Sequence, residues 1–451
     1  MRIIHFLAVL MLSGFCFAQE SEISSSTDFI AESYEDDFLS PEFHNKKREE
    51  LRKLMPDNSV AIFFSNPIRN RSNDVDYEYH QDPNFYYLTG LNEPNSILVI
   101  YKTPQKINNQ LTNEVVFVQE RNEDKEIWTG KRLGVEGVEK SLKIKSVRLN
   151  REFKKIDLKL ENFSMITYSV PTEGMKDNPF EKEDMFNLRQ QFEAHLFEAQ
   201  DEVIKKGEYN IWMAKLREVK EEEELVLLRR AIDITCKAQN ELLRAIKPGM
   251  KEYQSEAIVE FIFKLEGAEY PGFPSIQGSG ANSCVLHYQT NRKQMSGKNL
   301  LVSDVGAEYH GYTADVTRTM PVDGKFSKEE AAIYNLVLKA QTAGIEAAKV
   351  GENFWSSNVA ATTVLSQGLK ELGIIQTPLE LKRYFMHGTS HYLGLDVHDM
   401  GTYGKLQENS VITVEPGIYI AEGSPCDPKW WNIGVRIEDD ILITKEGPVN
   451  L

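Results

Sequence analysis

Two acidic residues occupy unusual positions in the stretch LVSDVGAEYHGYTADVTRTM, which otherwise has the composition of two buried, paired strands. Asp304 and Asp315 lie eleven residues apart, on either side of a turn that contains a glycine. A carboxylate in an apolar strand is unfavourable unless something neutralises its charge. For Asp304 alone an ion pair or an exposed position would be the simpler explanation.

A second pair of acids lies in a similar setting near the end of the chain, where Glu415 and Glu438 occur in SVITVEPGIYI and IGVRIEDDILIT. The likeness is a weak indication of an internal duplication. If the two predicted hairpins face each other, four carboxylates converge, and their repulsion requires cations. Two divalent ions would balance four carboxylates, so the pattern predicts a metal pair of the kind used in hydrolysis.

Histidines are concentrated in the segment FMHGTSHYLGLDVHDMG, which contains His387, His391 and His398. For one histidine, a core or surface residue bonded to the backbone is the usual explanation. Three of the nine histidines of the chain within twelve residues favour a functional role. We therefore expect a histidine to join the carboxylates as the fifth metal ligand.

Length and composition indicate the kind of domains that must position these residues. The chain has 451 residues, of which 41% are apolar and 27% charged, as expected for two globular domains. The net charge of −16 argues against a nucleic acid or an anionic membrane as partner, because both bind clustered Lys and Arg. The oligomeric state, including a homo-oligomer, stays open.

The first 18 residues have the pattern of a secretory signal peptide. Arg2 precedes an apolar run, and Cys16 and Ala18 are small enough for the −3 and −1 positions of a cleavage site. The run is shorter than the roughly 20 residues of a membrane span, and no later segment is long and apolar enough for one. We expect an exported protein, either periplasmic or secreted.

The remaining chain divides into three parts. Residues 19–40 are rich in serine and acids and predict a flexible leader. Residues 41–218 contain a helix that ends before Pro56 and strand-like runs separated by turns, which predict a small α/β domain. Residues 219–451 form the second predicted domain, which begins with an amphipathic helix after an acidic start.

Taken in order, these motifs resemble the M24 metallopeptidases, and within them the aminopeptidase P group. The resemblance includes FMHGTSHYLGLDVHD, VEPGIYI, IGVRIEDD, PGMKEYQSEAIVEFIF and YPGFPSIQGSGANSCVLHYQTN. Upstream, RNRSNDVDYEYHQDPNFYYLTGLNEPNSILVIYK is similar to the amino-terminal domain of that group. It implies a mixed α/β (α+β) chain with a creatinase-type amino-terminal domain and a pita-bread catalytic domain.

The resemblance also implies the roles of individual residues. The implied metal ligands are Asp304, Asp315, His391, Glu415 and Glu438, with Asp315 and Glu438 bridging two ions. The residues that match others of the family's active site are His287, His387, His398, Arg436 and Tyr419. Arg436 would steady the ligand carboxylates from behind. His310 matches no site histidine and is expected to be a loop residue.

The implied activity is removal of the residue that precedes a proline in second position, by attack of a hydroxide held between two metal ions. One histidine with four carboxylates suits Mn²⁺, which relatives commonly use, and also accepts Co²⁺, Fe²⁺ or Zn²⁺. A prolidase acting on Xaa-Pro dipeptides is the alternative, although the sequence motif HGTSHYLG resembles aminopeptidase P more. Other members of the family match less well. Methionine aminopeptidase lacks the amino-terminal domain, and creatinase lacks the full set of metal ligands. A non-catalytic binding protein of this fold is also disfavoured, because such relatives typically lose ligands and all five positions are filled here.

Overall fold

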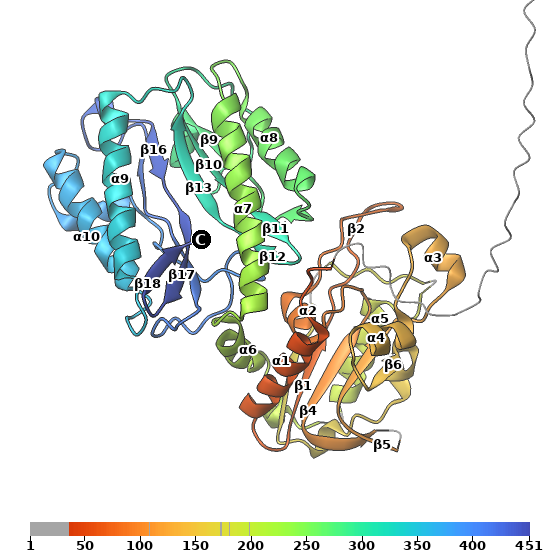
Figure 1. The fold of residues 1–451 in the computed structure, drawn as a ribbon. Helices are drawn as coiled ribbons and strands as arrows, with labels where there is room; N and C mark the ends of the chain where they lie inside the picture. Colours follow the sequence, from red (N-terminus) through yellow and green to blue (C-terminus); the bar gives the residue numbers. More distant parts are fainter. Residues whose placement is uncertain (1–35, 108, 172–173, 180, 198) are drawn as a thin grey trace, which may run out of the picture.

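The computed structural model describes residues 36–107, 109–171, 174–179, 181–197 and 199–451. The expected signal peptide and most of the expected leader lie outside the described residues. Figure 1 shows two domains, one with the early strands and one that contains β8 to β18, with helix α6 between them. Among the described residues, no helix combines the length and apolar character that a membrane span requires.

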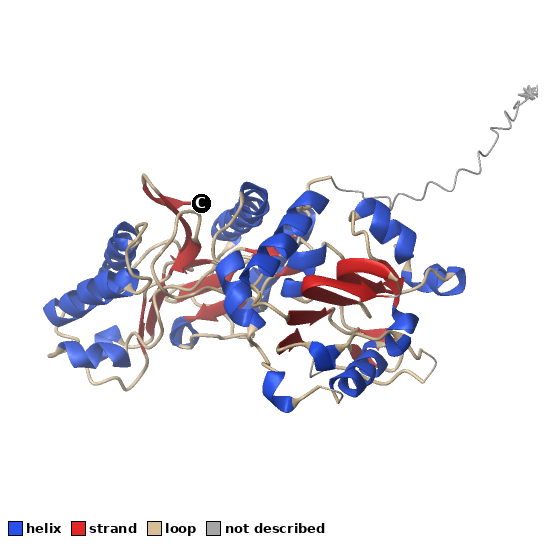
Figure 2. Ribbon diagram, turned by 90° about the horizontal axis from the view of Figure 1, so that it is seen from below, coloured by secondary structure: helices blue, strands red, loops and turns tan. Residues whose placement is uncertain are grey.

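A five-stranded sheet with the order β6-β5-β4-β1-β7 forms the centre of the amino-terminal domain. β1 pairs antiparallel with β4 and parallel with β7, and every residue of β1 is buried. Helices lie on both sides of these strands in Figure 2, which explains why the strands are continuous apolar runs rather than alternating ones. The strands of this domain are β1 (Ser59–Phe64), β2 (Asn70–Ser72), β3 (Val75–Asp76), β4 (Ile97–Ile107), β5 (Gln110–Val118), β6 (Val147–Leu149) and β7 (Met165–Ser169).

Side chains cap the amino-terminal ends of α1, α2, α3 and α5. The Ser40 hydroxyl accepts a hydrogen bond from the backbone N–H of Phe43 at the start of α1, and the helix ends at Leu54, just before Met55 and Pro56. The sequence analysis predicted that this first helix ends before Pro56, and this prediction is confirmed. The helices are α1 (Pro41–Leu54), α2 (Pro83–Thr89), α3 (Glu123–Thr129), α4 (Gly134–Ser141), α5 (Met185–Leu196) and α6 (Tyr209–Arg217).

Two long hairpins with the same plan form the carboxy-terminal domain. In the first, β10 pairs with β13 and, further out, β11 pairs with β12. In the second, β14 pairs with β17, and β15 with β16. Helices α7 and α8 contact the first hairpin and its neighbouring strands, whereas α9 packs on the second. The strands are β8 (Tyr270–Pro271), β9 (Ile276–Ser279), β10 (Leu300–Val305), β11 (Ala307–Tyr309), β12 (Tyr312–Thr313), β13 (Val316–Pro321), β14 (Val411–Val414), β15 (Gly417–Ile420), β16 (Ile433–Arg436), β17 (Asp439–Thr444) and β18 (Gly447–Asn450).

The long helices of this domain are α7 (Glu222–Ala245), α8 (Glu252–Leu265), α9 (Lys328–Ala347) and α10 (Ser356–Glu371). α7 starts with a capping box, in which the Glu221 side chain accepts from the third helical N–H and Glu224 accepts from the N–H of Glu221. This is the amphipathic helix that the sequence predicted after the acidic run, and it ends before Pro248.

Each hairpin passes from one sheet to another, and the four acids singled out in the sequence lie at or next to these transitions. Asp315 falls between β12 and β13, Glu415 between β14 and β15, and Glu438 between β16 and β17. At the first transition the two arms approach closely: a Cβ on Gly306 would lie 1.7 Å from the carbonyl oxygen of Ala314. Only glycine allows this approach.

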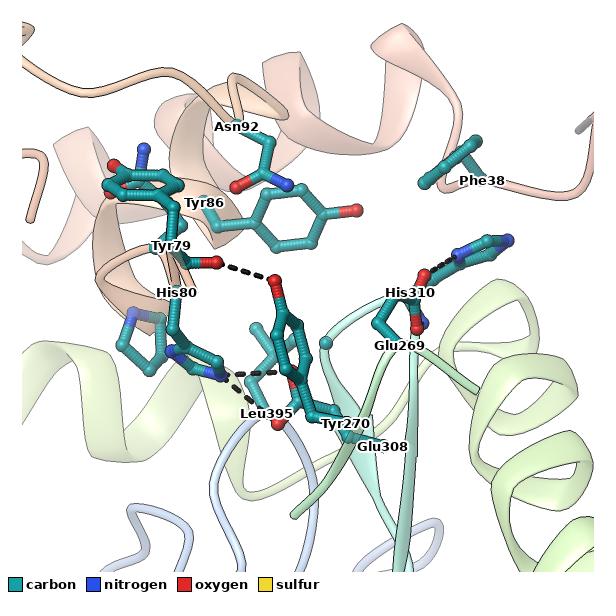
Figure 3. A pocket seen from close by; sticks show the side chains of 13 residues that line it. Phe38, Tyr79, His80, Tyr86, Asn92, Glu269, Tyr270, Glu308, His310 and Leu395 are labelled. Carbon is teal, nitrogen blue, oxygen red and sulfur yellow. Dashed lines mark hydrogen bonds and ion pairs between the residues drawn. The ribbon is translucent and has the colours of Figure 1, made fainter. Parts of the chain in front are cut away.

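The end of the predicted leader is packed rather than loose. The Tyr309 hydroxyl donates to Asp37 over 2.8 Å, and the ring of Phe38 stacks on His310 with ring centroids 3.8 Å apart. The two ring nitrogens of His310 lie 2.7 Å from Glu269 Oε1 and 2.9 Å from Asp37 Oδ1. Figure 3 shows His310 and Phe38 at a small cavity of about 70 Å³ between the domains. His310 is a turn residue as expected, but its side chain is buried between two carboxylates.

The first testable prediction concerns this histidine. His310→Gln should lower the free energy of unfolding by about 2 kcal/mol near pH 6. Burial opposes the charged ring, but the hydrogen bonds with Glu269 and Asp37 outweigh it and raise the pKa of His310. A group whose pKa rises on folding stabilises the protein fully below its unfolded-state pKa, and this contribution is lost as the pH rises through the folded-state pKa.

Urea unfolding of both proteins at several pH values checks this prediction. The difference between wild type and His310→Gln should be greatest near pH 6 and smaller near pH 9. A difference that stays constant over this range would show that the histidine acts by packing alone.

Candidate metal centre

A cavity of about 470 Å³ lies where the two hairpins face each other. Its walls bring together the acidic residues from both hairpins and the histidines from the loops around them. The residues from the sequence prediction that line it are Asp304, Asp315, Glu415, Glu438, His287, His387, His391, His398 and Arg436. Tyr419, the remaining predicted site residue, is buried behind Arg436.

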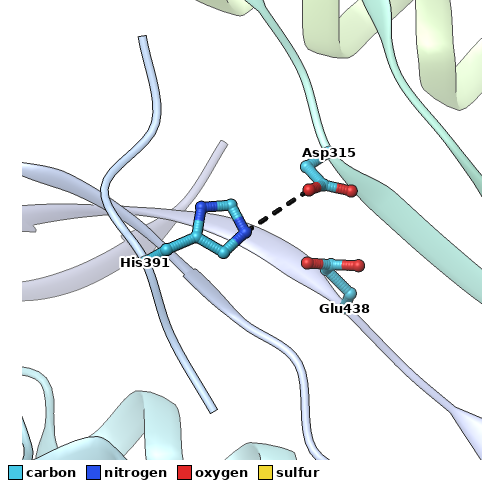
Figure 4. A group of neighbouring side chains, drawn as sticks. All are labelled: Asp315, His391 and Glu438. Carbon is cyan, nitrogen blue, oxygen red and sulfur yellow. Dashed lines mark ion pairs between the residues drawn. The ribbon is translucent and has the colours of Figure 1, made fainter. Parts of the chain in front are cut away.

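Three of these residues form a compact group that fits a metal ion (Figure 4). Asp315, His391 and Glu438 each offer a ligand atom, and these atoms lie within 4.8 Å of one another. His391 Nε2 is 3.5 Å from Asp315 Oδ2. The other ring nitrogen, Nδ1, lies 3.0 Å from the carbonyl oxygen of Tyr392 and donates to it. This bond leaves Nε2 as the ring nitrogen that faces the carboxylates.

The remaining two predicted ligands lie at the edges of this group. Glu415 Oε1 is 3.5 Å from His391 Nε2. Asp304 is on β10, where its Oδ2 accepts a hydrogen bond of 2.6 Å from Arg436 Nη2. All five predicted ligands therefore border one cavity, with a histidine shared between the carboxylates of the two hairpins.

Burial, together with the neighbouring charges, raises the pKa of three of these carboxyl groups. Burial raises the pKa of Asp315 well above its ordinary value, and the charges of Asp304 and Glu415 add to the effect. Burial and the charge of Asp315 do the same for Glu438. The pKa of Glu415 is also raised, chiefly by burial. Such a set is unfavourable as four carboxylates without compensating positive charge.

Divalent cations fit this donor set. Among the described residues, Asp304 Oδ1 and Asp315 Oδ1 are buried oxygens without a hydrogen-bond partner, although buried polar atoms are nearly always paired. Carboxylate oxygens and one imidazole nitrogen are ligands that suit divalent first-row metals. Bound cations would pair these oxygens and remove the repulsion within the group.

A chain of hydrogen bonds leads from Asp304 to the rim of the cavity. Arg436 Nη1 donates to the Tyr419 hydroxyl over 2.9 Å, and this hydroxyl lies 2.8 Å from His387 Nε2. Nδ1 of His387 is 2.8 Å from the carbonyl oxygen of Gly388. Burial, with Arg436 nearby, lowers the pKa of His387 to about 4, so its ring is neutral at pH 7. Nδ1 then carries the proton, and the Tyr419 hydroxyl donates to Nε2.

The other two histidines are more exposed. The ring of His398 contacts that of His391 edge-on, with centroids 4.3 Å apart. Burial and the neighbouring His391 lower the pKa of His398. His287 lies on the segment that follows β9, and the buried carboxylate of Glu252 organises this segment by accepting from the N–H groups of Ser279 and Lys293.

Two supporting residues were missed in the sequence. The Thr317 hydroxyl donates to Glu438 Oε2 over 2.6 Å and accepts from Arg436 Nε over 3.1 Å. Asp440 Oδ2 accepts from the backbone N–H of Asp315 over 3.1 Å. Each lies two residues after a predicted ligand, so the alternation of side chains along a strand could have identified both. The individual roles assigned to the site residues stay predictions.

Comparisons with known proteins agree with this geometry. The model of metallopeptidase family M24 matches residues 226–445, and that of the aminopeptidase P amino-terminal domain matches residues 44–163. The Xaa-Pro aminopeptidase of Escherichia coli (strain K12) is 33% identical over 425 residues, which are 92% of this chain and 95% of that protein.

Solved structures are similar over the same length. Proline aminopeptidase P II from Yersinia pestis has a TM-score of 0.80 at 33% identity and covers 91% of this chain and 96% of its own. Aminopeptidase P from E. coli with the inhibitor Pro-Leu has a TM-score of 0.79 at 32% identity and covers 92% and 95%. The predicted fold, a creatinase-type domain followed by a pita-bread domain, is confirmed.

The second testable prediction concerns the charge balance of the metal group. Glu438→Gln keeps the size of the side chain but removes one of the negative charges that compensate the metal ions. Metal content per chain and hydrolytic activity should fall together, each by at least about tenfold. Elemental analysis beside an activity assay checks this, and full metal content with normal turnover would exclude Glu438 as a ligand.

The third testable prediction separates a ligand from a residue that acts on the substrate. His398→Ala should lower kcat by roughly 10²- to 10³-fold and leave metal content nearly unchanged, because the ring lies beside the carboxylate group rather than within it. If the variant instead loses its metal, His398 and His391 have exchanged roles.

Proposed function

The chain belongs to metallopeptidase family M24, and on that premise we propose how its residues remove the amino-terminal residue from peptides with proline in second position. The chain is a hydrolase, a metalloexopeptidase of the Xaa-Pro aminopeptidase type. The observation that carries the proposal is the convergence of Asp315, His391 and Glu438 on one cavity. The sequence prediction of family and activity is confirmed.

Divalent metal ions belong to this family's chemistry, and the residues that would hold them are Asp304, Asp315, His391, Glu415 and Glu438. We propose two ions, because four carboxylates would balance a charge of +4. Mn²⁺ is the proposed metal, since oxygen ligands dominate the set. When bound, such a pair lowers the pKa of water towards neutrality and polarises a carbonyl oxygen.

The side chains around the ligands bind the peptide and move protons. His398 is at the rim and neutral at pH 7, so it can donate a hydrogen bond to the oxygen that gains negative charge, or carry a proton to the leaving nitrogen. The imidazole of His387 is held in place by Tyr419. Arg436 fixes Asp304 and Tyr419 at the same time, so these two groups keep their separation during the reaction.

Specificity for an amino terminus follows from charge. The cavity is lined by four carboxylates and one guanidinium group, and carboxylates attract the ammonium group of a free peptide end. Proline in second position makes the leaving nitrogen an amide nitrogen without a hydrogen. The relative from E. coli was solved with the inhibitor Pro-Leu, which fits a site that accepts proline with a continuing residue.

We propose that this protein is exported, because residues 1–18 have the pattern of a signal peptide: a basic start, an apolar run and the small residues of a cleavage site.

The fourth testable prediction decides between an aminopeptidase and a prolidase. The tripeptide Arg-Pro-Pro should be cleaved after its first residue at least about tenfold faster than the dipeptide Arg-Pro. The physical reason is that, among the described residues that line the cavity, Arg436 is the one Lys or Arg. It is already engaged with Asp304, so none of these side chains provides a free permanent cation for the carboxylate of a dipeptide.

Comparison of kcat/KM for Arg-Pro-Pro, Arg-Pro and acetyl-Arg-Pro-Pro is the measurement. Acetylation should abolish cleavage, because it removes the ammonium charge. Preference for the dipeptide would identify a prolidase, and turnover of the acetylated peptide would exclude an aminopeptidase.

A further inference from the structure

We propose that Arg217, in the segment that joins the two domains, is a positioning residue for His398, which lies on the loop that begins at His391. The proposal rests on the proposed function, since the position of this loop matters because His398 acts in catalysis. His391 itself is bonded to Thr413 of β14, which holds it independently of Arg217. The segment, residues 217–220, connects α6 to α7. The loop, residues 391–402, leads from His391 through His398 towards β14.

Arg217 joins three parts of the chain through one side chain that is 1% exposed. Its Nη1 donates to Asn84 Oδ1 on α2 of the amino-terminal domain, over 2.9 Å. Its Nη2 donates to Asp396 Oδ2 over 2.9 Å and also to Asp399 Oδ1. One guanidinium therefore binds the amino-terminal domain and two acids of the histidine loop.

The neighbours of Arg217 bind the same loop. Lys220 is buried, and its ammonium donates to Asp399 Oδ2 over 2.9 Å and to the carbonyl oxygen of Arg217 over 2.6 Å. Glu218, also buried, accepts from the Tyr392 hydroxyl over 3.0 Å and from the backbone N–H of Thr402 over 2.9 Å. The segment thus holds the loop near both of its ends.

The loop has little regular structure to fix its shape. It makes isolated bridges, between Tyr392 and Asp399 and between Tyr392 and Ile412. The Asp399 carboxylate also stabilises the shape of the loop, because its Oδ1 accepts a hydrogen bond from the backbone N–H of Met400 over 2.8 Å. A Cβ on Gly394 would lie 2.1 Å from Asp399 Oδ2 and 3.0 Å from Lys220 Cε. The charged pair therefore lies directly against the backbone of the loop, with His398 as the residue next to Asp399.

Removal of Arg217 would leave Asp399 buried, with Lys220 as the one cation that donates to it among the described residues. A buried carboxylate that loses a hydrogen-bonded cation is strongly destabilised, so the loop would have to move. Small displacements of catalytic groups reduce rates far more than they reduce binding. Mutation of residues that orient metal ligands typically costs 10- to 100-fold in activity.

We expect Arg217→Met to lower kcat about 10- to 100-fold, with KM and metal content close to those of wild type. The effect should vanish in the His398→Ala background, where the group that Arg217 positions is gone. If Arg217→Met lowers kcat by the same factor in wild type and in the His398→Ala background, the two residues act independently and the proposal is overturned. An unchanged kcat in Arg217→Met would also overturn it.

A readout independent of activity is hydrogen–deuterium exchange of the loop. The amides of Asp399, Met400 and Thr402 are bonded within the loop or to Glu218. In Arg217→Met they should exchange at least about tenfold faster. Wild-type cleavage of Arg-Pro-Pro tests the proposed function, while the exchange experiment tests the positioning, so failure of one is distinguishable from failure of the other.

Arg48→Met is the matched control. Arg48 is also 1% exposed and also binds a carboxylate, but its partners Glu114 and Leu88 all lie in the amino-terminal domain. Its replacement should lower stability and leave kcat and the exchange of residues 391–402 unchanged. If the loop exchanges faster in this control as well, the faster exchange in Arg217→Met reflects general destabilisation of the protein, and the proposal is overturned.

If Arg217→Met does not fold, Asn84→Ala carries the same test. It removes one neutral acceptor of the guanidinium and leaves the charged pairs in place. The loop amides should then exchange at least about threefold faster and kcat should fall by a similar factor, in the range of one lost hydrogen bond. Unchanged exchange in this variant would overturn the proposal.

Discussion

Repulsion among four carboxylates around one cavity is the constraint on which the rest of the molecule depends. Asp304 lies in β10, and Asp315, Glu415 and Glu438 lie at three strand transitions of the two hairpins. A core formed by such groups is stable only if positive charge and hydrogen-bond donors compensate them. The surrounding structure supplies donors from Arg436 and Thr317, and leaves the remaining charge to be balanced by metal ions.

The hairpins alone do not complete the site, because the histidines come from elsewhere. His387, His391 and His398 lie on the connection between a short 3₁₀ helix, Pro378–Arg383, and the strand β14. This connection has little regular structure, so its shape depends on partners outside the hairpins. The linker residues Arg217 and Lys220 are among them. The amino-terminal domain is therefore tied to the reaction centre through contacts that include α2.

The sequence was informative wherever a local pattern carried the signal. The pairs of acids in apolar strands and the three clustered histidines identified the cavity, and local patterns predicted helices α1 and α7. It failed where contacts join distant residues. His310 is 273 positions from Asp37, and Arg217 is 182 positions from Asp399. Neither residue differs in its local sequence from an exposed, solvated one, so burial of these charges could not be predicted.

The raised pKa values of Asp315 and Glu438 have a consequence for how the protein acquires its metal. Carboxylates with raised pKa values retain protons at higher pH in the metal-free protein, and an incoming ion must displace them. Each metal is therefore exchanged for protons, and its apparent affinity increases as the surroundings become more alkaline. In an acidic medium protons occupy the same oxygens and neutralise the repulsion in the ions' place.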